Sequence, residues 1–153
     1  MQLERADLCR LIPHADAMCL LDGVLEWTSD YIRCISDSHQ NSQNPLRHYG
    51  RLSALCAFEY GAQAAAVHGG LCTNQHPAPA YLAALRDGRC HVRYLDNIAE
   101  TLQVEAWLQY RTTGNQIYQS RISAGDLTVA KVRITVMAIQ QRHAALAKNL
   151  AND

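Results

Sequence analysis

The chain has 153 residues, 14 Lys and Arg against 14 Asp and Glu, and a 48% share of apolar residues. This composition argues against a disordered chain, and the balanced charge argues against a general affinity for nucleic acid or anionic membranes. The length predicts one domain, residues 1–153, large enough to bury a hydrophobic core.

The opening residues, Met1 to Asp16, mix both charge signs and lack an apolar core, so we expect no signal peptide. The longest apolar stretch, around Leu52 to Val67, is interrupted by Glu59 and Gln63 and is too short to cross a bilayer. The six cysteines form no C-x-x-C pair and lie mostly in apolar runs, which favours reduced, buried thiols. We therefore expect a cytoplasmic protein.

The first third of the chain predicts a helix, two strands and a loop. Residues 1–13 hold a short helix over Glu4 to Ile12, which Pro13 ends. Two strand-like runs follow, Met18 to Trp27 and Tyr31 to Ser36, joined by a turn. Residues 37–50 form a polar loop, and a loop of that length in a compact domain is often functional.

The clearest element is an Ala-rich central helix over residues 53–69. Ser53 is a plausible N-cap, and Gly69-Gly70 predicts the C-terminal end. Apolar or small residues occur on nearly every side of this helix, which predicts burial on nearly every side.

The remainder predicts strands over residues 81–94, 101–110, 116–124 and 127–139, with an irregularity at Asp87-Gly88 and an exposed tail over 140–153. The order predicts an α+β fold in which a curved antiparallel sheet wraps around one long central helix, the hotdog arrangement. The free edge of such a sheet favours pairing with a second subunit.

Glu59 is the strongest candidate for chemistry. It belongs to a stripe of the central helix at helical spacing: Leu52, Leu55, Cys56, Glu59, Ala62 and Ala66. A carboxyl group buried among apolar residues is costly when ionised, and such groups are often general acids or bases. The alternative is a structural Glu satisfied by a neighbour such as Gln63, one turn later.

An imidazole could be the partner base, because it takes up a proton near pH 7. His14, His39, His48 and His68 are the candidates, although each one taken alone is more typical of a surface or capping residue. The spacing His68-x3-Cys72-x3-His76 has a loose metal-ligand rhythm, but glycines and prolines break the helix that would align it. We therefore expect no metal, and no motif indicates a nucleotide cofactor.

Three motifs resemble the hotdog 3-hydroxyacyl-[acyl-carrier-protein] dehydratases. They are residues 11–24 (LIPHADAMCLLDGV), similar to an LPHxxPxLLxDxV opening, residues 59–63 (EYGAQ), similar to ExxAQ, and residues 81–89 (YLAALRDGR). Residues 44–47 (NPLR) and 50–52 (GRL) resemble the subgroup linked to aryl polyene lipid biosynthesis. The similarity extends over about residues 8–139.

The resemblance implies loss of water from a 3-hydroxyacyl thioester, with Glu59 protonating the departing hydroxyl. The fatty-acid enzymes carry their catalytic His where this chain has Pro45. In the aryl polyene subgroup, the resemblance places the recurrent His in the opening motif, at His14. The base that the resemblance implies is His14 first, with His48 second and His68 third. Backbone N–H groups near Ser53 would stabilise the enolate-like oxygen.

The substrate-binding residues implied by the same resemblance are Gln63, Pro45, Leu52, Ser53, Leu55 and His68. An acyl carrier protein would be the partner, and Arg47, Arg51 and Arg86 are candidates for docking it, although plain solvated surface is the more typical role of each. The chain would form a homodimer or a heterodimer with another hotdog subunit. Two alternatives stay open: an acyl thioesterase, and a non-catalytic acyl-binding partner subunit.

Overall fold

The structure, a computed structural model, describes residues 2–12, 18–73 and 80–138. His14, His76 and the tail over residues 140–153 lie outside the described residues. None of the described helices combines the length and apolarity that a membrane span requires.

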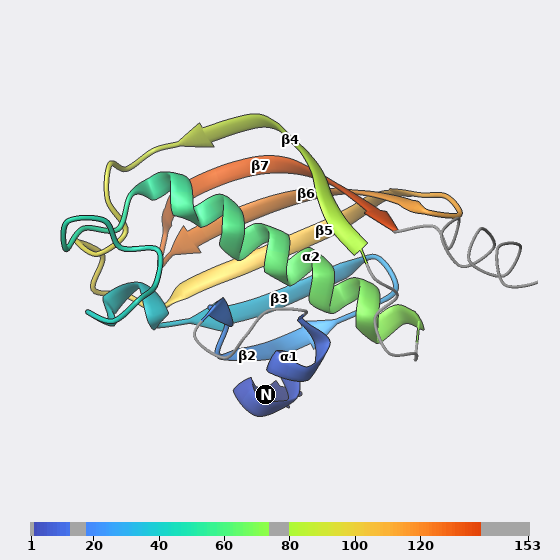
Figure 1. Cartoon of the computed structure of the whole chain (residues 1–153), viewed down its shortest axis with the longest axis horizontal. Coiled ribbons are helices and arrows are strands. Elements are labelled where there is room, and N and C mark those ends of the chain that lie inside the picture. Colours follow the sequence, from blue (N-terminus) through green and yellow to red (C-terminus); the bar gives the residue numbers. More distant parts are fainter. Residues whose placement is uncertain (1, 13–17, 74–79, 139–153) are drawn as a thin grey trace, which may run out of the picture.

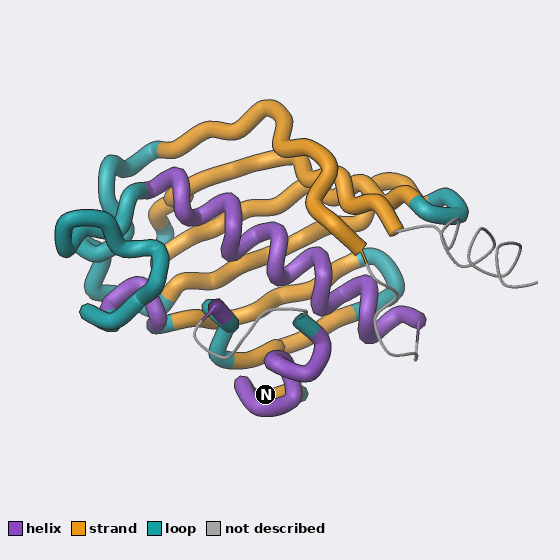
Figure 2. The backbone as a smooth tube through the Cα atoms, viewed as in Figure 1, coloured by secondary structure: helices purple, strands orange, loops and turns teal. Residues whose placement is uncertain are grey.

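Seven strands form one antiparallel sheet in the order β1-β2-β3-β5-β6-β7-β4. Their bounds are β1 Leu3–Glu4, β2 Gly23–Trp27, β3 Tyr31–Ser36, β4 Ala80–Cys90, β5 Leu102–Arg111, β6 Asn115–Ala124 and β7 Leu127–Ala138. The sheet curves, and one long helix lies along its concave face (Figures 1 and 2). The predicted α+β hotdog fold is confirmed.

The helices are α1 (Arg5–Leu11) and α2 (Ala57–Thr73), and a 3-10 turn (Ala54–Cys56) leads into α2. Ser53 is the N-cap of that turn, since its hydroxyl accepts the N–H of Leu55. The predicted end at Gly69-Gly70 is wrong, because α2 continues to Thr73. A Cβ on Gly69 would lie 3.2 Å from Gln116 Oε1, and one on Gly70 would lie 3.4 Å from the Leu11 side chain. These two glycines lie inside the helix and do not end it.

The predicted strand over Met18 to Trp27 is half wrong, because β2 begins only at Gly23. The preceding Cys19, Leu20 and Leu21 are buried, so their apolar pattern reflects the core and not a strand. The side chain of Gln63 forms hydrogen bonds with the backbone of this segment, at Met18 and Leu20.

The other strands agree with their predicted positions to within a few residues, except that the segment after Cys90 leaves the sheet. The predicted turns are present, with positive φ angles at Gly114 and Gly125. The predicted irregularity in β4 is a shift of register between Arg86 and Arg89. β4 pairs with β7 along one side only, so it forms one edge of the sheet.

Candidate functional site

Helix α2 buries one face against the sheet, and the residues of its other face are half-buried. Ala57, Tyr60, Gly61, Ala64 and Val67 lie on the buried face. A Cβ on Gly61 would meet Ser120 Oγ at 2.7 Å, so helix and sheet are in tight contact here. The composition had predicted burial on nearly every side, and the face that carries Glu59 is instead half-buried.

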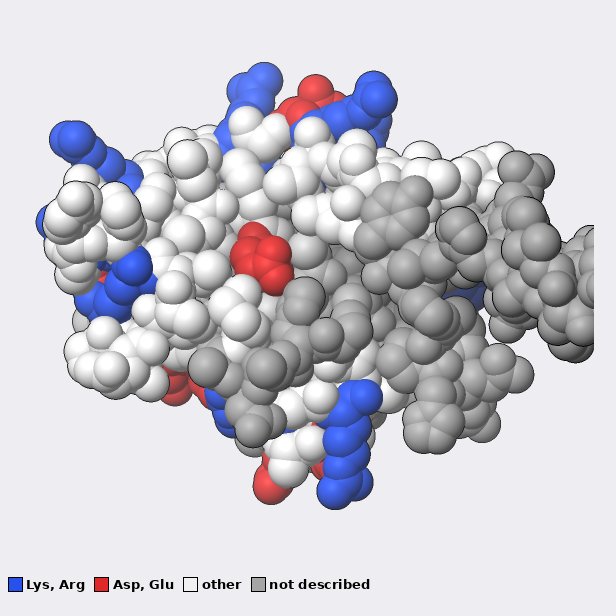
Figure 3. Space-filling view, in the orientation of Figure 1, with Lys and Arg blue, Asp and Glu red and all other residues white. Residues whose placement is uncertain are grey.

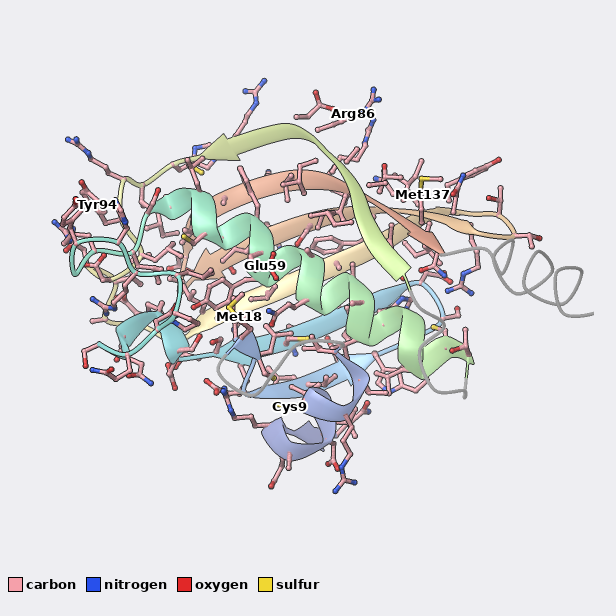
Figure 4. All side chains as sticks on the ribbon, viewed as in Figure 1. Cys9, Met18, Glu59, Arg86, Tyr94 and Met137 are labelled. Carbon is pink, nitrogen blue, oxygen red and sulfur yellow. The ribbon has the colours of Figure 1, made fainter. Side chains whose placement is uncertain are left out.

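Glu59 belongs to this other face of α2. Glu59 is half-buried, and so is its neighbour at helical spacing, Ala62. Its other neighbour at this spacing, Leu55, is 66% exposed. The label in Figure 4 places Glu59 on the side of α2 that faces away from the sheet. In the same orientation, Figure 3 shows an acidic group in the middle of this face, bordered by uncharged residues and by residues not described. The site is thus a carboxylate on an apolar, accessible helix face.

Gln63 links Glu59 to the segment that follows the opening motif. Its Nε2 donates to Glu59 Oε1 at 3.3 Å and to the Met18 carbonyl at 2.6 Å. Its Oε1 accepts the N–H of Leu20 at 2.9 Å. Gln63 is only 2% exposed, so these hydrogen bonds are protected from water. Gln63 therefore fixes residues 18–20 beside Glu59, a contact that explains why this segment needs no strand partner.

The start of α2 is held by polar contacts. Leu52, which is fully buried, donates its N–H to Asp96 Oδ1 at 2.7 Å, and Arg51 pairs with the same carboxylate at 2.8 Å. The N–H groups of residues 54–57 already donate to the Arg93 carbonyl, the Ser53 hydroxyl, the Ser53 carbonyl and the Ala54 carbonyl. These groups would have to exchange partners to bind a thioester oxygen.

The loop over residues 37–50 is joined to α2 by a network that the sequence did not reveal. The Tyr60 hydroxyl lies 2.7 Å from Ser38 Oγ and 3.2 Å from Asn44 Nδ2, and burial raises the pKa of Tyr60. Arg47 donates to the carbonyls of Asn41, Gly50 and His39. The Asn and Arg of the NPLR motif therefore hold the loop in place.

His48 lies on the exposed end of this loop. It forms a bridge with Arg51 and its ring contacts Tyr49 edge-on. The exposed Pro45 lines a hollow of about 520 Å³ between α1, residues 19–22 and the loop. His48 thus makes its described contacts with Tyr49 and Arg51, while Pro45 shares its hollow with Cys19 and Leu20.

His68 is fully buried at the opposite end of α2. Its Nδ1 lies 2.9 Å from the Tyr118 hydroxyl and its Nε2 lies 2.8 Å from the Thr28 carbonyl. Burial lowers the pKa of His68. Nine residues of helix place it about 13 Å along the axis from Glu59. Its position fits a structural role in the core.

His39 is likewise buried, with Nε2 at 3.1 Å from the Ile98 carbonyl, and burial lowers its pKa. Three of the four candidate bases thus make their contacts elsewhere, and the fourth, His14, lies outside the described residues. Within the described ranges, no group of three His, Cys, Asp or Glu side chains is arranged to hold a metal ion.

Comparisons with known proteins point to one family. The sequence model of the ApeP-like family, described as ApeP dehydratase, matches residues 6–147. No curated protein matches the chain. Among solved structures, the dehydratase heterocomplex ApeI:P from Xenorhabdus doucetiae is similar with a TM-score of 0.80 at 20% identity, covering 93% of this chain and 97% of that chain.

Two further solved structures share the fold at lower identity. The AziG protein of S. sahachiroi gives a TM-score of 0.63 at 11% identity, with 86% of this chain and 99% of that chain covered. A mutant of thioesterase PA1618 from Pseudomonas aeruginosa gives 0.62 at 12% identity, with 90% and 94% covered. The family match spans most of the chain and agrees with the resemblance in its motifs. The chain belongs to the ApeP-like dehydratase family.

Proposed function

We propose that this dehydratase removes water from a 3-hydroxyacyl thioester carried by an acyl carrier protein in the cytoplasm, with Glu59 as the proton donor. The observation that carries the proposal is Glu59 itself, placed on an accessible apolar helix face and hydrogen-bonded to Gln63. An apolar surface beside one carboxyl group suits an acyl chain whose reacting carbons must meet an acid.

In the proposed reaction, an imidazole takes the proton from the carbon next to the thioester carbonyl. The bond between the third carbon and its hydroxyl oxygen then breaks, and the electron pair of the former C–H bond forms the new double bond. Protonated Glu59 gives its proton to the departing hydroxyl, which leaves as water. Transfer of the proton from the imidazolium to the Glu59 carboxylate restores both groups.

We propose that a second hotdog subunit covers the face that carries Glu59. Leu55 is 66% exposed, and Leu82 and Leu85 on the edge strand β4 are each 42% exposed. Among the described strands, β4 pairs with β7 alone, so its outer edge can accept another strand. The similar Xenorhabdus doucetiae structure is a heterocomplex, which supports a heterodimer over a homodimer. The base is then His14 or an imidazole of that second subunit.

Product analysis tests this function against its two alternatives. A 3-hydroxyacyl thioester on a carrier protein is incubated with the chain alone and with a second hotdog subunit, and mass spectrometry follows the acyl group. Loss of one water with the thioester intact is the expected result. Release of a free acid would identify a thioesterase instead. Binding without turnover in both settings would identify a non-catalytic acyl-binding subunit.

Histidine variants in the same assay separate the possible bases. His14→Ala is expected to lower turnover by roughly 100-fold or more if this chain supplies the base. His48→Ala is expected to change turnover less than twofold, since the described contacts of His48 are with Tyr49 and Arg51. Full turnover in His14→Ala would assign the base to the second subunit.

A further inference from the structure

Four exposed basic side chains gather on β4 and β7. Arg86 is the direct cross-strand partner of Arg133, and Arg89 is the partner of Lys131. Direct partners in an antiparallel pair project from the same face of the sheet. These four residues, called the basic ridge below, therefore form two adjacent pairs of like charge.

The basic ridge has no evident structural purpose. Like charges directly opposite each other destabilise a sheet, and the chain as a whole carries 14 positive against 14 negative side chains. Asp87, which is 77% exposed, lies 3.9 Å from Arg133. Among the residues that the structure describes, no carboxylate lies within ion-pair distance of Arg86, Arg89 or Lys131.

Other arginines that the sequence offered for docking are already engaged. Arg47 donates to three backbone carbonyls, as described above. Arg51 pairs with Asp96, donates to Asn97 and stacks 3.8 Å from the Tyr94 ring centre. On the basic ridge, by contrast, Arg86 and Arg89 have no ion-pair partner among the described residues.

The basic ridge lies on the part of β4 that contacts the Glu59 turn of α2. The register shift between Arg86 and Arg89 brings Gly88 against Phe58, since a Cβ on Gly88 would lie 2.8 Å from the Phe58 ring. Phe58 immediately precedes Glu59. Arg86 points away from α2 in Figure 4. A subunit added in the plane of the sheet at the edge of β4 would leave this outer face open.

We propose that the basic ridge is the surface on which an acidic acyl carrier protein docks, an inference that rests on the proposed function for its carrier-linked substrate. Charge complementarity is the supporting argument, because a cluster of unpaired cations steers an acidic partner and sets its association rate. The ridge lies on the strand segment that packs against Phe58, the residue that precedes Glu59.

The test compares carrier binding with turnover of a small substrate. An acidic type II acyl carrier protein in its holo form is immobilised, and the association rate of the full chain is measured at low and high salt. Arg86→Glu combined with Lys131→Glu is expected to lower the association rate about tenfold at low salt, and high salt is expected to remove the difference. Turnover of an N-acetylcysteamine thioester is expected to stay within twofold of the original chain.

Two matched variants complete the design. Asp87→Asn removes the acidic group beside the ridge and is expected to raise the association rate, and Asn tolerates the positive φ of 53° at that position. Arg10→Glu reverses an exposed charge on α1 and is expected to leave carrier binding unchanged.

Three results would overturn the proposal: unchanged carrier binding in the double variant, equal loss with the N-acetylcysteamine thioester, or loss of the complex with the second hotdog subunit. Binding of duplex DNA or anionic vesicles, in place of the carrier, through the same residues would overturn it as well. A chain that binds the carrier through the ridge but never forms the enoyl product would refute the proposed function and leave the docking surface standing.

Discussion

Gln63 Nε2 donates to Glu59 Oε1 at 3.3 Å from one turn further along α2. The same amide binds the backbone of Met18 and Leu20, so the orientation of Glu59 and the path of the segment after the opening motif depend on one side chain. This arrangement makes Gln63 a positioning residue for the proposed acid.

Replacement of Gln63 separates this role from a general surface role. Gln63→Ala leaves the Leu20 N–H and the Met18 carbonyl without their partner, and we expect a loss of roughly 2–4 kcal/mol in the free energy of unfolding. Turnover is expected to fall with it. Gln63→Glu is expected to keep an acceptor for the Leu20 N–H, but it can donate to the Met18 carbonyl only if protonated. The control Gln119→Ala, on the outer face of β6 opposite Arg133, is expected to change stability by under about 0.5 kcal/mol. Urea unfolding measures the free energy of unfolding of the Gln63 and Gln119 variants.

The two glycines Gly61 and Gly69 of α2 are expected to respond to alanine with opposite signs. A methyl group at Gly61 meets Ser120 Oγ at 2.7 Å and Ile134 Cδ1 at 3.3 Å, and we expect a net loss of about 1–2 kcal/mol. At Gly69 the nearest atom is the flexible end of Gln116 at 3.2 Å. Gly69→Ala is therefore expected to be neutral or stabilising by up to about 1 kcal/mol, because alanine favours the helix. Thermal unfolding of the two variants decides this; equal losses would contradict the close contact at Gly61.

The buried imidazole of His68 predicts a loss of stability in mild acid. Burial lowers its pKa below the ordinary value of 6.5 in the folded chain. The unfolded chain therefore binds a proton as the pH falls through about 6.5, while the folded chain does not, so the free energy of unfolding decreases until the folded pKa is reached. The slope is at most about 1.4 kcal/mol per pH unit for one proton.

His68→Gln tests this dependence. We expect its stability to fall less steeply than that of the original chain below pH 6.5, with the remaining slope coming in part from His39, whose pKa burial also lowers. Denaturant unfolding across pH 5 to 8 gives the comparison. An unchanged slope would show that His68 keeps its ordinary pKa.

Arg47 is expected to control the order of the loop over residues 37–50. Its guanidinium serves three carbonyl groups, which an ammonium group on a flexible stem cannot reach together. Arg47→Lys is expected to cost about 1–3 kcal/mol and to speed amide hydrogen exchange in this loop. Arg10→Lys on α1 serves as the control, and protection unchanged in both variants would contradict the role of Arg47.

Much of the fold was predictable because the local patterns and the tertiary structure agree. The alternation in Tyr31 to Ser36 and the meander after Thr101 indicate strands that the structure contains. The pattern failed where tertiary contacts decide: the apolar residues 19–21 fill the core without forming a strand, and α2 continues through Gly69-Gly70 to Thr73.

The site was only partly predictable for a related reason. Glu59 and Gln63 stand out in the sequence, and the structure joins them. The apolar pattern of α2 could not tell a face buried by its own sheet from a face left for another molecule, so Glu59 was expected to be more buried than it is. The role of Arg47 and Asn44 in holding the loop depends on backbone carbonyls, which no residue pattern displays.

The most direct test of the account is turnover of Glu59→Gln on a carrier-linked 3-hydroxyacyl thioester, in the presence of the second hotdog subunit. Glutamine keeps a hydrogen-bonding group beside Gln63 but has no acidic proton to give to the departing hydroxyl. We expect unchanged unfolding and unchanged carrier binding, with turnover lowered roughly 100- to 10,000-fold. Turnover within a few-fold of the original chain, in a folded Glu59→Gln that still binds the carrier, would contradict the role of Glu59 as the acid.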